Sequence, residues 1–139
     1  MAEDDDATLG TRDYRTLARF RRELRAFLHF SEEAARAEGL TPAQHQLLLA
    51  VRGHPADGPP SISEVAEALR LKTHSVGGLV DRAEEGGLVA SHVDPADGRR
   101  RLIEVTPAGE GILERLSALH RRELRRFRDE MGALLEDLD

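Results

Sequence analysis

The stretch from Asp94 to Gly109 constrains the fold more than any other part of the sequence, because it combines the signals of a turn, a strand and a helix start. Its Asp-Pro and Asp-Gly pairs favour turns, and residues 102–105 (Leu-Ile-Glu-Val) favour a strand. Thr106 and Pro107 then supply a helix N-cap followed by proline at the first helical position. The sequence therefore predicts a β-hairpin that returns into a helix. Three consecutive arginines follow the turn: Arg99, Arg100 and Arg101.

Two short amphipathic segments precede this hairpin and are separated by a turn near Leu71. Residues 61–64 form a capping box that opens the first segment, and Gly86-Gly87 closes the second. The apolar residues at helical spacing are Ile62, Val65, Ala66 and Leu69, followed by Val76, Leu79, Val80 and Ala83. This pattern predicts a helix-turn-helix, and with a first strand at 88–93 the whole region is a winged helix-turn-helix.

Amphipathic segments at the N-terminal side predict two further helices. From Arg12 to Glu38 apolar residues recur at three- and four-residue steps, and Gly39 is expected to end that helix. A second capping box at 41–44 begins a shorter helix that runs to Gly53. The acidic residues before Arg12 are expected to be disordered.

The C-terminal segment from Pro107 to Leu138 carries an apolar stripe typical of a coiled coil, and His120 lies in it. A break is expected between Arg128 and Gly132, because glycine disfavours a helix. Since neither terminal segment can bury its stripe against a small winged helix, we expect both to pack together and against a second copy of the chain, in an isologous homodimer. The expected fold class is mainly α with a small β-hairpin. The expected organisation is a disordered acidic leader (1–11), an N-terminal dimerisation helix (12–38), a winged helix-turn-helix DNA-binding region (40–106) and C-terminal dimerisation helices (107–139).

Composition excludes several classes of function. The 139 residues fit one domain, and the lack of cysteine excludes disulfides, thiolate zinc sites and cysteine-based redox sensing. A net charge of -6 argues weakly against nucleic acid, but seven of the 26 acidic residues lie in the two tails, and 19 acidic against 20 basic residues remain. Because no signal peptide or long apolar run is present, we expect a soluble cytoplasmic protein without a membrane partner.

Several short segments carry a family resemblance: residues 39–44, 63–66, 79–82 and 86–89, and in the wing Asp94, Asp97, Arg99, Thr106 and Gly109. On these residues the chain resembles the MarR (multiple antibiotic resistance regulator) family of bacterial transcription factors over roughly residues 12–138. The resemblance implies a homodimer whose recognition helices enter major grooves of DNA and whose wings reach adjacent minor grooves. It also implies control by a small-molecule ligand near the junction of the dimer helices and the winged domain.

Two features of the predicted recognition helix depart from the family pattern. Lys72 stands where members usually have serine or threonine, so Thr73 is the alternative N-cap of the recognition helix. Gly77 and Gly78 lie inside that helix, where each costs up to about 1 kcal/mol relative to alanine. They either allow close approach to the DNA backbone or simply reduce the number of base contacts.

The predicted DNA contacts come from the start of the recognition helix and from the wing. Side chains and backbone N–H groups near the helix N-terminus would meet base edges and phosphates. Arg99 would enter the minor groove or bind a phosphate, oriented by Asp94 or Asp97. Arg100 and Arg101 would bind phosphates, although neighbouring strand residues point to opposite faces. The full predicted set is Lys72, Thr73, His74, Ser75, Gly77, Gly78, Arg82, Arg99, Arg100 and Arg101, with Asp94 and Asp97 as orienting residues; a solvated surface residue is the alternative for each.

Two other groups of polar residues do not predict a site of their own. His29 with Glu33 and His120 with Glu123 have helical ligand spacing, but without a His-Glu-x-x-His motif they predict no metal site, and no cofactor is expected. His120 is more simply a hydrogen-bonded or pH-responsive interface residue, and His45 could line an effector pocket. A second basic run is expected to be a solvated or salt-bridged helix face: Arg121, Arg122, Arg125, Arg126 and Arg128.

These features predict a sequence-specific double-stranded DNA-binding transcription regulator. We expect a homodimeric repressor that binds a pseudo-palindromic operator and responds to a small-molecule effector. The alternative is a winged-helix interaction module whose arginine tip meets an acidic protein. An enzyme is the weaker rival, because the sequence has no glycine-rich phosphate loop after a strand, no nucleophile elbow and no acid–base pair.

Overall fold

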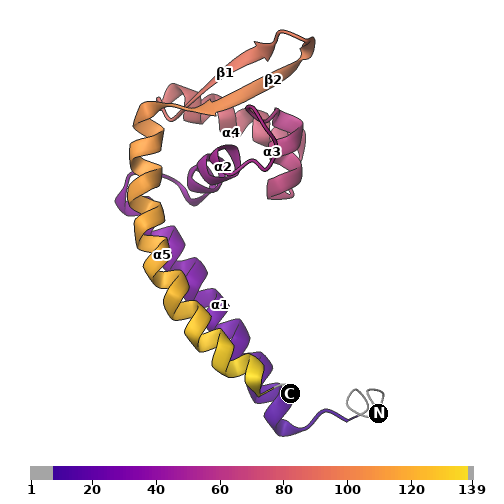
Figure 1. Ribbon diagram of the computed structural model, residues 1–139, viewed down its shortest axis with the longest axis vertical. Helices are drawn as coiled ribbons and strands as arrows, with labels where there is room; N and C mark the ends of the chain where they lie inside the picture. The colour runs from indigo at the N-terminus through magenta and orange to yellow at the C-terminus, as the bar shows by residue number, and fades with distance from the viewer. Residues whose placement is uncertain (1–7, 138–139) are drawn as a thin grey trace. The chain divides into compact units, whose positions relative to one another are not determined.

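The computed structural model describes residues 8–137, which form five helices and one two-stranded antiparallel sheet (Figure 1). In chain order these are α1 (Thr11–Ala37), α2 (Pro42–Arg52), α3 (Ile62–Leu69), α4 (Thr73–Glu85), β1 (Val89–Asp94), β2 (Asp97–Val105) and α5 (Pro107–Glu136). The predicted fold class and element order are confirmed. Most of the expected leader, residues 1–7, lies outside the described part of the chain.

The chain divides into two compact units. We call residues 1–33 with 119–139 the helical unit, and residues 34–118 the winged unit. The winged unit holds α2, α3, α4 and the hairpin, which are the elements expected to meet DNA. Within residues 8–137, no helix combines the length and the apolar character needed to cross a membrane.

Both predicted capping boxes are confirmed and set the starts of α2 and α3. At α2 the hydroxyl of Thr41 accepts from the backbone N–H of Gln44 at 3.1 Å, and the amide oxygen of Gln44 accepts from the N–H of Thr41 at 3.0 Å. Ser61 and Glu64 make the same two bonds at α3, at 3.2 and 3.1 Å. These bonds satisfy N–H groups that a helix start otherwise leaves without partners.

The apolar faces of α2, α3 and α4 meet the hairpin in one core. The positions predicted to face inward are buried or half-buried throughout. Since burial of apolar surface is worth about 25 cal/mol per Å², this core is the main stabilising term of the winged unit. Its largest fully buried side chains include Leu47, Leu48, Val65, Val76, Val80 and Ile103.

Strand β2 is held along both of its edges. It pairs with β1 in register from Val89↔Val105 to Val93↔Arg101, after which the pairing shifts by an irregularity at Asp94. On the other edge, the N–H of Ile103 donates to the carbonyl of Pro60 at 3.0 Å, and Leu102 pairs with Ser61. The base of the hairpin is therefore fixed to the segment that leads into α3, while its tip projects away from the helices of the winged unit (Figure 1).

The helical unit consists of the first part of α1 and the last part of α5. The rings of Phe27 and Phe127 lie 5.3 Å apart, and Nε2 of His120 lies 2.8 Å from the hydroxyl oxygen of Ser31. His120 is thus a hydrogen-bonded residue between two helices, as predicted. Ion pairs between the two helices run in antiparallel order: Arg12–Asp137 and Arg19–Glu130.

The predicted break near Gly132 is wrong, because α5 is continuous through residues 107–136. Glycine lowers helix propensity by about 1 kcal/mol, but tertiary packing overrides a penalty of that size. Met131 and Leu134, on either side of Gly132, are 6% and 3% exposed, and their burial holds the helix together. Leu138, the last predicted member of the stripe, lies outside the described residues.

Among the glycines of the described residues, Gly109 leaves the least room for a side chain. A Cβ there would collide with the carbonyl oxygen of Leu88 and lie 2.9 Å from Cγ1 of Val105. We predict that Gly109→Ala lowers the free energy of unfolding by about 1–3 kcal/mol, the range for overpacking. Gly111→Ala in the same helix is the control, because its Cβ would meet only the end of Arg115, at 3.8 Å, among the described residues.

Urea unfolding of the three proteins measures this difference. Gly111→Ala should raise the midpoint slightly through helix propensity, and Gly109→Ala should lower it without changing the slope. Equal midpoints for the two variants would contradict the close packing of α5 against the hairpin base.

Candidate nucleic-acid interface

Helix α4 buries one face in the core and leaves the other to solvent. Its N-cap is Lys72, without a side-chain cap hydrogen bond, so the alternative in which Thr73 caps the helix is wrong. Thr73 is the first helical residue instead, and its hydroxyl lies on the exposed side. The residues predicted to meet DNA are exposed at Lys72, Thr73, His74, Ser75 and Arg82, and half-buried at Gly77 and Gly78.

At the wing tip, two aspartates fold the turn, and Asp97 also holds Arg99. Asp94 accepts from the backbone N–H of Ala96 at 2.9 Å. Asp97 accepts from the N–H of Arg99 at 3.1 Å and from its side-chain Nε at 3.3 Å. The side chain of Arg99 is nevertheless 92% exposed. Asp97 therefore orients the start of this side chain while the end of the guanidinium group faces solvent.

Arg101 ties the hairpin to α4. Its Nε donates to the hydroxyl of Ser91 on β1 at 2.8 Å, and its Nη2 lies 3.0 Å from Asp81 and 3.3 Å from Glu84 on α4. The hydroxyl of Ser91 also donates to Glu84 at 2.9 Å. This guanidinium group is therefore bonded to side chains of both α4 and β1. The sequence did not predict these bonds, because the carboxylates lie far from Arg101 along the chain.

Arg100 is bonded to a different helix. Its Nη2 lies 2.7 Å from Glu64 on α3, and its Nη1 lies 3.4 Å from Asp94. Adjacent residues of a strand point to opposite faces, so Arg100 and Arg101 meet different helices. Of the two aspartates predicted to orient Arg99, the structure brings Asp97 to it and pairs Asp94 with Arg100.

A hollow of about 390 Å³ lies between the wing and the helix pair. Its lining combines serine and threonine residues at the starts of α3 and α4 with the three arginines of β2. Hydroxyls and guanidinium groups are the donors that proteins commonly offer to phosphate oxygens. The lining residues are Ser61, Ile62, Ser63, Thr73, Arg99, Arg100 and Arg101.

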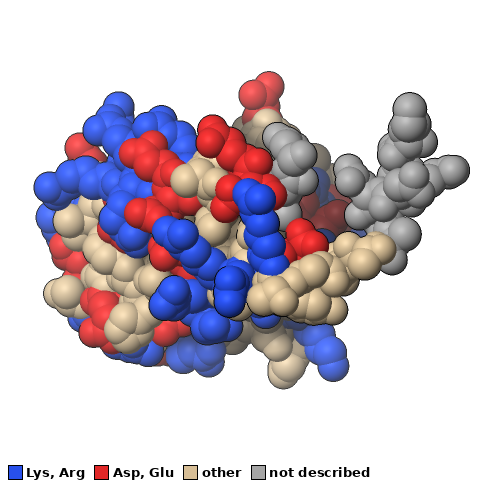
Figure 2. Space-filling model, turned by 90° about the horizontal axis from the view of Figure 1, so that it is seen from below, with Lys and Arg blue, Asp and Glu red and all other residues tan. Residues whose placement is uncertain are grey.

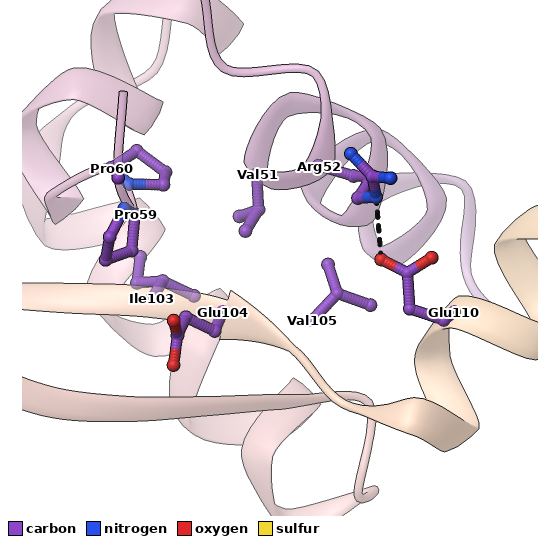
Figure 3. A pocket seen from close by; sticks show the side chains of 9 residues that line it. Val51, Arg52, Pro59, Pro60, Ile103, Glu104, Val105 and Glu110 are labelled. Carbon is purple, nitrogen blue, oxygen red and sulfur yellow. Dashed lines mark ion pairs between the residues drawn. The ribbon is translucent and has the colours of Figure 1, made fainter. Parts of the chain in front are cut away.

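A second hollow, of about 280 Å³, lies beneath the base of β2 (Figure 3). Val51, Ile103 and Val105 give it an apolar wall together with the loop prolines. At one side Arg52 and Glu110 form an ion pair of 2.8 Å. No signal in the sequence predicts this hollow, because its walls come from α2, the loop before α3, β2 and α5. His45, which could line an effector pocket, is buried in α2 and is not among the residues that line this hollow.

In the second basic run, Arg126 and Arg128 form ion pairs. Arg126 lies 2.6 Å from Glu123 and 3.6 Å from Glu23, and Arg128 lies 3.3 Å from Asp129. Acidic side chains lie among the basic ones on the face of the molecule seen in Figure 2. At these two positions the structure agrees with the interpretation of the run as a solvated or salt-bridged helix face. Among residues 8–137, no three His, Asp or Glu side chains gather closely enough to hold a metal ion.

Comparison with known proteins gives consistent matches. A family model described as MarR family matches residues 38–100. The putative transcriptional regulatory protein for the hcr operon of Thauera aromatica is 30% identical over 96 residues, which cover 69% of this chain and 56% of that protein. The transcriptional repressor NicR of Pseudomonas putida is 33% identical over 75 residues, covering 54% and 46%. The chain thus spans about half the length of these relatives.

Solved structures agree with the fold. One is of Bordetella bronchiseptica BpsR, whose DNA binding is described as regulated by 6-hydroxynicotinic acid. It superimposes with a TM-score of 0.64 at 25% identity, covering 84% of this chain and 89% of that one.

Proposed function

This chain belongs to the MarR family, and from that premise we propose that it is a sequence-specific double-stranded DNA-binding transcription regulator rather than an enzyme. The observation that carries the proposal is the exposed start of α4 beside a stiff hairpin that displays Arg99. An α-helix fits the major groove of B-DNA, which is about 12 Å wide. An arginine on a projecting tip fits the narrower minor groove next to it.

The two elements would have separate tasks. The exposed residues 72–75 at the start of α4 would meet base edges and phosphates, and Arg82 would meet a phosphate further along. Arg99 would bind in the minor groove or to a phosphate, with Asp97 holding its orientation. The hollow between the wing and the helix pair is a candidate site for a DNA phosphate, which the hydroxyl-bearing residues Ser63 and Thr73 and the exposed Arg99 would approach.

We further propose that the protein acts as a homodimer on a pseudo-palindromic operator and represses transcription by occupying it. Half-sites about 10 base pairs apart would match one helical turn of DNA. The helical unit supports dimerisation, because it leaves large apolar side chains between about one third and three fifths exposed. These side chains are Tyr14, Leu17, Phe20, Leu28, Leu124 and Leu135.

A small-molecule effector is the third part of the proposal. The description of BpsR supports it, since that regulator responds to 6-hydroxynicotinic acid. In this chain the hollow beneath β2 is a candidate site, because a molecule bound there would contact Ile103 and Val105, on the strand that carries the wing. It would also contact Arg52, a cationic side chain in the lining.

Sedimentation analysis of the purified chain tests the oligomeric state. We predict a mass twice that of one chain at micromolar concentration. Leu17→Glu would place a charge on the exposed apolar stripe and should raise the dimer dissociation constant at least tenfold, since burying an unpaired charge is costly. A strictly monomeric wild-type protein would remove the basis for a palindromic operator.

Arg99→Ala tests the DNA interface. We predict that it weakens binding to all duplexes and reduces the slope of log K against log salt by about 0.9 for each phosphate that the variant no longer neutralises. Fluorescence anisotropy at salt concentrations from about 50 to about 200 mM measures the affinity and the slope, because affinity for DNA phosphates changes steeply over this range. Arg128→Ala is the matched control, because Arg128 is 75% exposed and pairs with the adjacent Asp129.

The control variant should bind DNA with the affinity of the wild type. The Arg99→Ala variant should unfold at the same midpoint as the wild type. Flat titrations of the wild type against duplexes selected from a random pool would contradict DNA binding. In that case the alternative function, an interaction module for an acidic protein, would gain support.

Gly77→Ala decides what the glycines of α4 do. A Cβ at Gly77 would meet no atom within 4 Å among the described residues, whereas one at Gly78 would lie 3.4 Å from Nη1 of Arg82. We predict that Gly77→Ala raises the free energy of unfolding by up to about 1 kcal/mol and leaves DNA affinity within about twofold. A stabilised variant with tenfold weaker binding would instead mean that the DNA backbone approaches Gly77 closely.

A further inference from the structure

Glu64 joins three parts of the winged unit. Its carboxylate accepts from the backbone N–H of Ser61 at 3.1 Å, which completes the capping box of α3. The same carboxylate lies 2.7 Å from Nη2 of Arg100 on β2 and 3.2 Å from Nε2 of His54 in the loop before α3. One side chain thus contacts the helix start, the loop and the wing.

Capping does not explain why this residue carries a charge. The capping box of α2 uses Gln44 at the equivalent position, where a neutral amide oxygen accepts from Thr41 at 3.0 Å. Glutamate and glutamine both serve in capping boxes. The negative charge of Glu64 therefore has another use, and the guanidinium group of Arg100 is the cation that it contacts.

The position of Arg100 suggests what that use is. Backbone bonds fix β2 to the segment before α3 at Leu102 and Ile103, but the hairpin continues beyond them to the tip. At about 3.3 Å per residue, Arg100 lies roughly 10 Å further out than Ile103. Arg101 is already tied to α4 through Asp81 and Glu84, and the bond of Arg100 to Glu64 adds a fixed point on α3 that lies one residue from Arg99. Asp94, on β1 of the same hairpin, holds the other end of this guanidinium group at 3.4 Å.

The charge state of Glu64 suits this arrangement. The hydrogen bond from the backbone of Ser61 has the largest effect and lowers the pKa of Glu64 below its ordinary value, while burial opposes it. The side chain of Ser61, His54 and Arg100 lower the pKa further by smaller amounts. The carboxylate is therefore ionised at neutral pH, and the pair with Arg100 is charge-assisted.

We propose that Glu64 is a positioning residue that fixes the angle of the wing against α3 through Arg100, so that Arg99 is presented to DNA and Arg100 acts as a strut rather than as a DNA ligand. This inference rests on the proposed DNA-binding function. It assigns different tasks to the neighbouring Arg99 and Arg100. It also gives α3 an indirect role in DNA binding, because Glu64 on this helix holds the wing.

Glu64→Gln tests the inference, because glutamine retains the capping oxygen and removes the charge. Simple electrostatics predicts tighter DNA binding when a carboxylate near DNA is neutralised, whereas a wing that is no longer held in place predicts weaker binding. We expect affinity for a duplex selected from a random pool to fall about tenfold, as when one well-placed side chain per half-site stops binding its base. The unfolding midpoint should change little, since half-exposed ion pairs add little to stability.

Glu67→Gln is the matched control, because it removes the same charge from an exposed position on the same helix. It should bind as well as the wild type or more tightly. Arg100→Gln should weaken binding as much as Glu64→Gln, and the double variant should bind no more weakly than either single variant, because the two residues act as one unit. Binding by Glu64→Gln that equals or exceeds that of the wild type would overturn the inference.

A measurement without DNA separates the inference from the proposed function. In the free protein, backbone amides at 98–101 should exchange hydrogen about fivefold faster in Glu64→Gln than in the wild type, while those at 102–105 stay unchanged. Unchanged exchange at residues 98–101 would contradict the proposal that the Glu64–Arg100 bond holds the wing in place. If the wild type bound no duplex while exchange rose as expected, the proposed function would fail and the structural role of Glu64 would stand.

Discussion

The attachment of β2 along both edges is the constraint on which the winged unit depends. One edge pairs with β1 and the other bonds to Pro60, directly before α3 begins. Ile103, at this junction, is fully buried and contributes to the same core as the helix pair. A hairpin tethered on one edge alone would swing about its base. Attachment on both edges turns it into a projecting element with a defined direction.

Side-chain charges then refine what the backbone fixes. The net charge of -6 says little about nucleic-acid binding, because the carboxylates of the winged unit are distributed around particular arginines. Arg101 is bonded to α4 and Arg100 to α3, whereas Arg99 remains 92% exposed beyond both. Exposed ion pairs contribute at most about 1 kcal/mol each to stability. Their effect in this hairpin is mainly geometric, since they decide which guanidinium group is available to a ligand.

Local signals in the sequence predicted the elements well. Capping boxes, positions of apolar residues and the turn chemistry of the wing each depend on residues a few positions apart, and the structure confirms them. The break expected at Gly132 was wrong, because burial of its neighbours outweighs a local preference. The bond between Arg100 and Glu64 could not be predicted, because the two residues lie 36 positions apart and Glu64 already had a role in the capping box. Tertiary interactions of this kind have no local signature.

A crystal structure of the dimer with a selected duplex tests the central claim most directly. The account predicts Arg99 in the minor groove or on a phosphate, while Arg100 and Arg101 retain their bonds to α3 and α4. Arg100 and Arg101 released from those carboxylates and bound to phosphates, with Arg99 left in solvent, would contradict it.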